Sequence, residues 1–127
     1  MMDGHRVTVL VVDDEPLVRM DLVEMLEAAR YRTREASCAA EAVEILEQDP
    51  AIRVVFTDIQ MPGSMDGLAL SHYVPERWPR TVIVICSANR TPAQEELSRD
   101  ANFIAKPFGR QELGRVLKKI ELRLSTL

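Results

Sequence analysis

Short apolar runs alternate along the chain with longer segments in which apolar residues recur every three or four positions. The runs are typical of buried strands, and the longer segments are typical of helices with one apolar face. The pattern predicts five strands, at residues 7–12, 31–36, 54–57, 81–86 and 102–105. Strands that alternate with helices form a parallel sheet with helices on both faces, joined by right-handed crossovers. We therefore predict a single α/β domain over residues 1–127.

Local signals mark where the helices begin and end. Pro16 is expected at the first position of the first helix, and Ser37 is expected to cap the second. A third helix should begin near Leu68, and Pro75 should break or kink it because proline has no amide hydrogen to donate. Residues 91–100 form a short fourth helix at best. The last helix carries an apolar face of Leu113, Val116, Leu117, Ile120 and Leu124.

Composition and charge exclude some classes of function. The chain of 127 residues is long enough to bury one core without metal or disulfide staples. Its 16 basic and 20 acidic residues give a net charge of −4, which argues against direct binding to DNA. Arg30, Arg32 and Arg34 alternate along one segment, and an exposed edge strand explains them better than a nucleic-acid site.

The chain contains no apolar run of the kind found in membrane spans or secretory signal peptides. Its two cysteines, Cys38 and Cys86, lack the spacing of metal ligands and are expected to be reduced thiols. We therefore expect a cytoplasmic protein that does not bind membranes.

The ends of the predicted strands carry polar residues of compatible chemistry: Asp13 and Asp14 after the first strand, Asp58 after the third, Ser87 after the fourth and Lys106 after the fifth. In open parallel sheets, ligands bind outside these ends. Three carboxylates that lie close together repel one another, so a hard cation such as Mg²⁺ should neutralise them. Lys106 and Ser87 can bind phosphate oxygens.

This set of groups suits the formation of an aspartyl phosphate, with Asp58 as the best nucleophile because it follows the central strand. Taken alone, each residue has a simpler explanation as a helix cap, a turn residue or a solvated charge. Compatible groups at four strand ends of one sheet favour a functional site instead.

Four segments carry a resemblance to a known family: VLVVDDEP, VVFTDIQMPGSMDG, VIVICSA and FIAKPF. In this order and strand context they resemble the receiver domain of two-component response regulators, and together they span nearly the whole chain. The resemblance implies a flavodoxin-like (CheY-like) fold. This is a (βα)5 three-layer sandwich whose five-stranded parallel sheet has the strand order 2-1-3-4-5.

The resemblance also assigns roles around the cation. It implies that Asp58 is the phosphoacceptor and that the side chains of Asp14 and Asp58 bind Mg²⁺, for which Mn²⁺ could substitute. Asp13 would act mostly through water, and the backbone carbonyl of Gln60 would be the third protein ligand.

Further roles follow from the same resemblance. Ser87 and Lys106 would bind the phosphoryl group, and the Lys106–Pro107 peptide bond would be cis. Phe103 matches the switch aromatic, although plain strand packing explains it equally well because Phe lacks the hydroxyl often found there. Gln60 and Asn89 match positions that tune the lifetime of the phosphoryl group.

The chain departs from the family pattern in two places besides Pro75. The loop MPGSMDG has one residue more than the common form, and Lys106 follows Ser87 by only 19 positions, fewer than in most receivers. The fourth helix and its flanking loops should therefore be trimmed. The face on which relatives usually signal and dimerise includes that helix, so the usual dimer mode is in doubt.

The preferred hypothesis is a phosphorylation-controlled signalling module. A sensor histidine kinase or a histidine phosphotransfer protein would donate the phosphoryl group to Asp58, and a downstream protein would read the switched surface. We expect a monomer or weak dimer that is not an enzyme, apart from its own Mg²⁺-dependent autophosphorylation and autodephosphorylation. The chain is either a stand-alone receiver, which Met1 favours, or a receiver cut from a larger protein.

Two other functions fit parts of the pattern. A phosphatase of the haloacid-dehalogenase type would carry a second Asp two positions after the nucleophile to transfer a proton, and this chain has Gln60 there. A pseudo-receiver that is never phosphorylated would be expected to lack Asp58, Lys106 or the acid pair, and all of them are present.

Overall fold

The computed structural model describes residues 7–88 and 102–125. These residues form one sheet of five strands: β1 (Thr8–Val12), β2 (Arg32–Ala36), β3 (Ile52–Asp58), β4 (Val82–Ser87) and β5 (Asn102–Ala105). Neighbouring strands are parallel, and their order is β2-β1-β3-β4-β5. The predicted fold class and the implied strand order are therefore confirmed, and the predicted strand ends differ by at most two residues.

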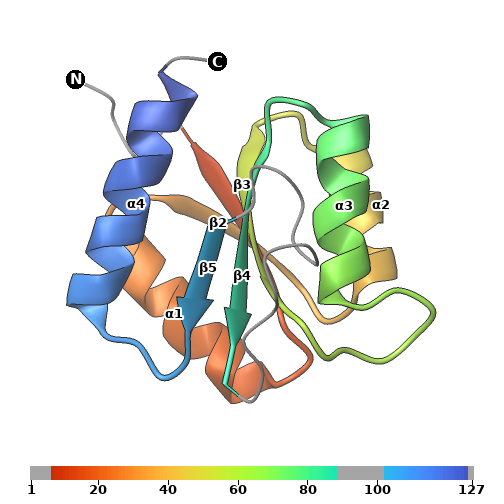
Figure 1. Cartoon of the computed structure of the whole chain (residues 1–127), viewed down its shortest axis with the longest axis horizontal. Coiled ribbons are helices and arrows are strands. Elements are labelled where there is room, and N and C mark those ends of the chain that lie inside the picture. The colour runs from red at the N-terminus through yellow and green to blue at the C-terminus, as the bar shows by residue number, and fades with distance from the viewer. Residues whose placement is uncertain (1–6, 89–101, 126–127) are drawn as a thin grey trace.

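The described residues contain four helices: α1 (Pro16–Ala28), α2 (Ala39–Gln48), α3 (Gly67–Arg77) and α4 (Arg110–Leu124). Helices α1 and α4 cover one face of the sheet, and α2 and α3 cover the other (Figure 1). None of these helices is long and apolar enough to cross a bilayer. The short helix expected at residues 91–100 lies outside the described residues.

Two hydrophobic cores lie on opposite faces of the sheet because successive strand residues point to opposite sides. Val11 and Phe56 join the core beneath α1 and α4, whereas Leu10 and Val55 join the core beneath α2 and α3. Strands β1, β3 and β4 lie at the centre of the sheet and are buried along nearly their whole length. This double-sided burial explains their nearly continuous apolar sequences.

Two predicted helix boundaries are wrong. The residue that precedes α2 is Cys38 and not Ser37, and no side chain caps the helix there. The backbone N–H of Ser37 donates to the carboxylate of Glu41 at 2.7 Å. Of the break or kink predicted at Pro75, the break does not occur, and α3 continues to Arg77. Pro75 lies in the last turn, where its missing N–H removes a single helical hydrogen bond.

Strand β2 is an exposed edge of the sheet, as predicted from its arginines. Arg32 and Arg34 are both exposed, and Nη1 of Arg34 forms an ion pair with Oδ2 of Asp49 at 3.0 Å. Charged side chains of this kind protect an edge strand from pairing with another chain.

Helix α1 ends in a turn that places Arg30 in the left-handed region, with φ = 72°. The N–H of Tyr31 donates to the carbonyl of Leu26 at 3.1 Å, and the N–H of Arg30 donates to the carbonyl of Glu27 at 2.9 Å. This pair of hydrogen bonds closes a helix with one left-handed residue, a position that glycine usually occupies.

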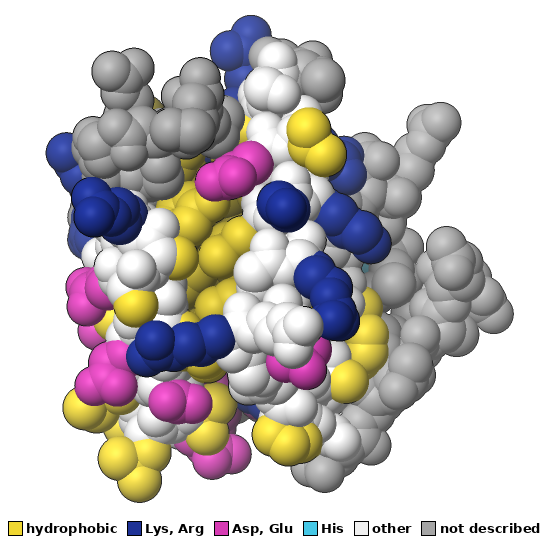
Figure 2. Space-filling view, turned by 90° about the vertical axis from the view of Figure 1, so that its left-hand side faces the viewer, with side chains coloured by type: hydrophobic (Ala, Val, Ile, Leu, Met, Phe, Trp, Pro, Cys, Tyr) yellow, Lys and Arg dark blue, Asp and Glu magenta, His cyan; other side chains and the backbone are white. Residues whose placement is uncertain are grey.

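Between α1 and α4 the molecular surface is hollowed, and hydrophobic side chains form the floor of the hollow (Figure 2). Its walls include Met25 and Ala28 from α1 and Leu113 and Gly114 from α4. Charged side chains flank the hollow on both sides (Figure 2). An apolar surface therefore runs between these two helices.

Candidate functional site

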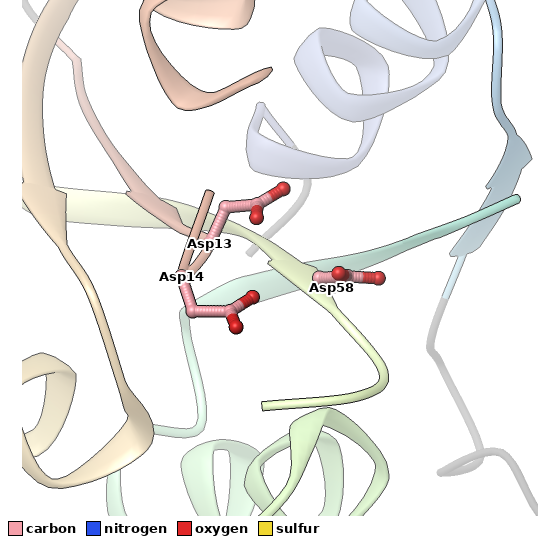
Figure 3. Close-up of side chains that lie close together, drawn as sticks. All are labelled: Asp13, Asp14 and Asp58. Atoms are coloured by element: carbon pink, nitrogen blue, oxygen red, sulfur yellow. The ribbon is translucent and has the colours of Figure 1, made fainter. Parts of the chain in front are cut away.

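The candidate site lies where β1 and β3 end side by side. Val12 of β1 pairs with Thr57 of β3, so the residues that follow them, Asp13 and Asp58, become neighbours at the carboxyl ends of these two strands. Carboxylate oxygens of Asp13, Asp14 and Asp58 all lie within 4.8 Å of one another. Figure 3 shows the three side chains extending from these strand ends into one region. The predicted acid cluster is therefore assembled.

Asp13 is the most enclosed of the three acids, with 4% of its surface exposed. Its Oδ2 contacts Nζ of Lys106 at 2.9 Å, and its Oδ1 accepts the backbone N–H of Glu15 at 2.9 Å. Both carboxylate oxygens of Asp13 are thus engaged within the protein. Asp14 is exposed, and Asp58 is partly exposed.

Lys106 brings a positive charge between two of the acids. Its Nζ lies 2.9 Å from Oδ2 of Asp13 and 3.8 Å from Oδ2 of Asp58. Burial alone would lower the pKa of Lys106, but the hydrogen bond and charge of Asp13, together with the charge of Asp58, raise that pKa above its ordinary value. The amine therefore stays protonated and remains a cation at the site.

Asp58 has one engaged and one open carboxylate oxygen. Its Oδ1 accepts the backbone N–H of Ile59 at 2.8 Å, while its Oδ2 is the oxygen nearer to Lys106. Burial raises the pKa of Asp58, the charge of Lys106 opposes that rise, and the charge of Asp13 adds to it. A further cation at this point would stabilise the ionised form of Asp58.

The other predicted site residues differ in their placement. Ser87 ends β4, is buried, and lines the same cavity as Asp58 and Lys106, and the loop residue Gln60 lines that cavity too. Phe103 lies on β5 but is not among the described residues that line the cavity. Its switch role stays a prediction, and Asn89 lies outside the described residues.

The peptide bond between Lys106 and Pro107 is cis, as the resemblance implied. The backbone N–H of Lys106 donates to the carbonyl of Ser87 at 3.0 Å. The ends of β4 and β5 are therefore joined next to the site.

The site opens into a cavity of about 1050 Å³ that extends beneath α1. The acids and Lys106 form its polar end, and apolar side chains line the rest, including Val18, Leu22, Met25, Phe56 and Phe108. At the rim, Leu17 of α1 is 79% exposed. An apolar surface therefore adjoins the charged groups.

Sequence reasoning missed two residues that support the site. The guanidinium of Arg19 donates from Nη1 to the main-chain carbonyl of Asp13 at 2.7 Å. The backbone N–H of Gly67, at the start of α3, donates to the carbonyl of Ile59 at 2.7 Å, beside Asp58. Each contact ends on a main-chain carbonyl, and a carbonyl is not indicated by any residue type in the sequence.

The loop between β3 and α3 contains one left-handed glycine and ends in a helix cap. Gly63 adopts φ = 104°, a conformation that favours glycine. At the end of the loop, Asp66 caps α3 by accepting the backbone N–H of Ala69 at 2.9 Å. The helix thus starts at a defined position beside Asp58.

The donor set fits a hard divalent cation. Asp14 and Asp58 offer carboxylate oxygens that water can reach, and oxygen ligands of this kind suit Mg²⁺. Asp13 is held by Lys106 and by the N–H of Glu15, so it would contribute mostly through water. The implied division of roles among the three acids stays a prediction.

Comparisons with known proteins show the relatives of this chain. A family model described as "Response regulator receiver domain" matches residues 9–118. The sensor kinase CckA of Brucella abortus is 33% identical over 117 residues, which cover 89% of this chain and 12% of that protein. The positive alginate biosynthesis regulatory protein of Pseudomonas aeruginosa is 35% identical over 116 residues, which cover 87% of this chain and 46% of that protein.

A structural comparison gives the same result. The crystal structure of a response regulator receiver protein from Sinorhizobium medicae WSM419 matches with a TM-score of 0.79 at 29% identity, covering 90% of this chain and 93% of that one. The chain spans less than half the length of the two curated relatives, whose remaining parts have no counterpart in it.

Proposed function

Because the chain belongs to the response regulator receiver domain family, we propose that it accepts a phosphoryl group on Asp58 and thereby switches its contacts with other proteins. Receiver domains bind Mg²⁺ through an acidic pocket and are phosphorylated by histidine kinases or phosphotransfer proteins. The observation that carries the proposal is the position of the Lys106 ammonium between Asp13 and Asp58, 2.9 Å from one and 3.8 Å from the other.

The chemistry begins at the open oxygen of Asp58. Oδ1 is held by the N–H of Ile59, so Oδ2 is the oxygen that attacks phosphorus. The new O–P bond forms as the P–N bond to the donor histidine breaks, and the imidazole leaves with the electron pair of that bond. When bound, Mg²⁺ supplies positive charge beside the transferring phosphoryl oxygens, and Asp14, Asp58 and the Gln60 carbonyl would hold it.

Lys106 and Ser87 would bind the product. Nζ of Lys106 can donate to a phosphoryl oxygen on Asp58, for which it would give up part of its contact with Asp13. The hydroxyl of Ser87, at the neighbouring strand end, would donate to another oxygen. Movement of these two residues toward the phosphoryl group would shift the conformational population, with Phe103 on β5 as the switch aromatic.

The partners follow from this function. A sensor histidine kinase or a histidine phosphotransfer protein would donate, and a downstream protein would read the change without direct contact to DNA or membrane. We propose that the domain acts in the cytoplasm as a monomer or weak dimer. Its reactions would be limited to its own Mg²⁺-dependent autophosphorylation and autodephosphorylation.

Intact-mass measurement after incubation with acetyl phosphate tests the proposal. With Mg²⁺ present, we expect one added phosphoryl group on the wild type, and none on Asp58→Asn or after chelation of the metal. The lack of an adduct on the wild type, with acetyl phosphate and with a cognate kinase, would overturn the phospho-switch and favour an adaptor that is not phosphorylated.

A further inference from the structure

Arg19 joins three parts of the fold at the edge of the acidic site. Its Nη1 donates to the main-chain carbonyl of Asp13 at 2.7 Å, and its Nε donates to Oε1 of Glu35 at 2.9 Å. Arg19 lies in the first turn of α1, Asp13 follows β1, and Glu35 lies on β2. The Arg19 side chain is 18% exposed. The guanidinium is therefore partly withdrawn from water and held from two sides.

The carbonyl of Asp13 needs a hydrogen-bond donor. Asp13 is 4% exposed, and a buried carbonyl without a partner is costly. This carbonyl lies past Val12, the last residue of β1, and the next element begins with Pro16, which has no N–H to offer. The charged donor from Arg19 satisfies the carbonyl at a point where the chain turns from strand to helix.

With this contact, each of the four polar atoms of Asp13 has a partner. The N–H donates to the carbonyl of Ala36 at 3.1 Å, and the other three atoms accept from Arg19 at 2.7 Å, from Glu15 at 2.9 Å and from Lys106 at 2.9 Å. The contact with Arg19 differs from the others in one respect. It holds the peptide group that links Asp13 to Asp14, and the orientation of this peptide group sets the direction of the chain at Asp14.

We propose that Arg19 is a positioning residue for the cation site. By holding the Asp13–Asp14 peptide against α1 and β2, it keeps the carboxylate of Asp14 within reach of Asp58. The inference rests on the proposed function, because it assumes that Asp14 and Asp58 bind a divalent cation. Groups that orient metal ligands in this way commonly change metal affinity by about 10-fold or more when they are removed.

The sign of the effect separates positioning from simple electrostatics. Arg19 is a cation at the edge of the acidic site, so its charge alone would repel a metal ion and its removal would tighten binding. Its ion pair with Glu35 already offsets much of that charge. If Arg19 positions the acid pair, its removal weakens metal binding although the site becomes more negative.

The test uses Mn²⁺ as the probe, with the free ion measured by electron paramagnetic resonance in titrations of the full chain. We expect Arg19→Met to raise the Kd for Mn²⁺ by about 10-fold. Arg34→Met is the matched control, because Arg34 also forms an ion pair on the β2 edge, with Asp49 at 3.0 Å, but does not touch the site. We expect Arg34→Met to bind Mn²⁺ with the Kd of the wild type.

The outcomes distinguish this inference from the proposed function. If the wild type binds Mn²⁺ and Arg19→Met binds it equally well or more tightly, positioning by Arg19 is overturned while the site stands. If the wild type itself does not bind Mn²⁺, the cation site and the inference fail together. Arg19→Leu, which also lacks both the charge and the donor to the Asp13 carbonyl, carries the same test with the same expected sign if Arg19→Met does not fold.

Discussion

The start of α3 touches the backbone that carries Asp58, and Gly67→Ala tests that contact. A Cβ atom at Gly67 would lie 1.8 Å from the main-chain oxygen of Asp58, 2.7 Å from its carbonyl carbon and 2.8 Å from Cα of Ile59. All three are backbone atoms, so no side chain can turn away. Ordinary contact begins near 3.4 Å, so the helix and the strand end must separate by about 1.6 Å.

This separation has an energetic cost that can be bounded. Overpacking of this kind costs about 1–3 kcal/mol. The displaced helix also loses the 2.7 Å hydrogen bond from the N–H of Gly67 to the carbonyl of Ile59, worth about 1 kcal/mol. We therefore expect Gly67→Ala to lower the free energy of unfolding by about 2–4 kcal/mol, a large share of the total stability of a small domain.

Urea unfolding followed by tryptophan fluorescence measures this loss. Trp78, the single tryptophan, directly follows α3 and therefore reports on the helix that must move. The same variant should also be phosphorylated more slowly by acetyl phosphate, because the backbone of Asp58 is displaced. Gly114→Ala is the matched control: a Cβ there meets nothing within 4 Å, and it should stabilise α4 by about 0.5–1 kcal/mol. A Gly67→Ala protein with the stability and phosphorylation rate of the wild type would refute the close contact.

Three further predictions concern single side chains. Arg30→Gly should raise the free energy of unfolding by about 1 kcal/mol, because it relieves the left-handed conformation at φ = 72°, and urea unfolding that shows no gain would contradict this. Lys106→Ala should lower stability by about 3 kcal/mol and slow phosphorylation, because it leaves the buried carboxylate of Asp13 without its partner at 2.9 Å; denaturation and intact mass measure the two effects. Burial raises the pKa of Cys86 from 9.0 to about 12, so the unfolded chain loses this proton first as pH rises. The contribution of the Cys86 thiol to the free energy of unfolding should therefore be present in full below pH 9.0. Between pH 9.0 and about pH 12 the free energy of unfolding should fall by up to about 1.4 kcal/mol per pH unit. Cys86→Ala should remove that part of the pH dependence in urea unfolding.

The fold could be predicted from the sequence because its central strands are covered on both faces. Their nearly unbroken apolar runs identify β1, β3 and β4, and the intervening helical patterns require parallel pairing. The helix boundaries were harder to predict from the sequence, since they depend on individual side chains. The Ser37 side chain makes no capping hydrogen bond to α2, which begins after Cys38, and Pro75 is tolerated because α3 ends within two residues.

The part of the site that lies at the ends of strands was predicted. Asp13, Asp14 and Asp58 lie together because β1 and β3 are neighbours in register, which the predicted topology already requires. Arg19 and Gly67 were not predicted, because each donates to a main-chain carbonyl, which no residue type in the sequence indicates.

The apolar cavity beneath α1 was likewise not indicated by the sequence. Its walls combine residues from α1 with others from β3, β4 and the turn that follows β5. Any phosphodonor that reaches Asp58 must approach this end of the molecule, where Leu17 is exposed. The charged site and the apolar surface beside it are thus parts of one accessible region.

The central claim is that Asp58 carries the phosphoryl group, and borohydride reduction tests it most directly. The reagent reduces an acyl phosphate to an alcohol, so a phosphorylated aspartate becomes homoserine and can be located by peptide mass mapping. The account predicts homoserine at position 58 alone, formed only after treatment with phosphodonor and Mg²⁺. Homoserine at position 13 or 14, or a phosphorylated protein that yields no homoserine at all, would contradict it.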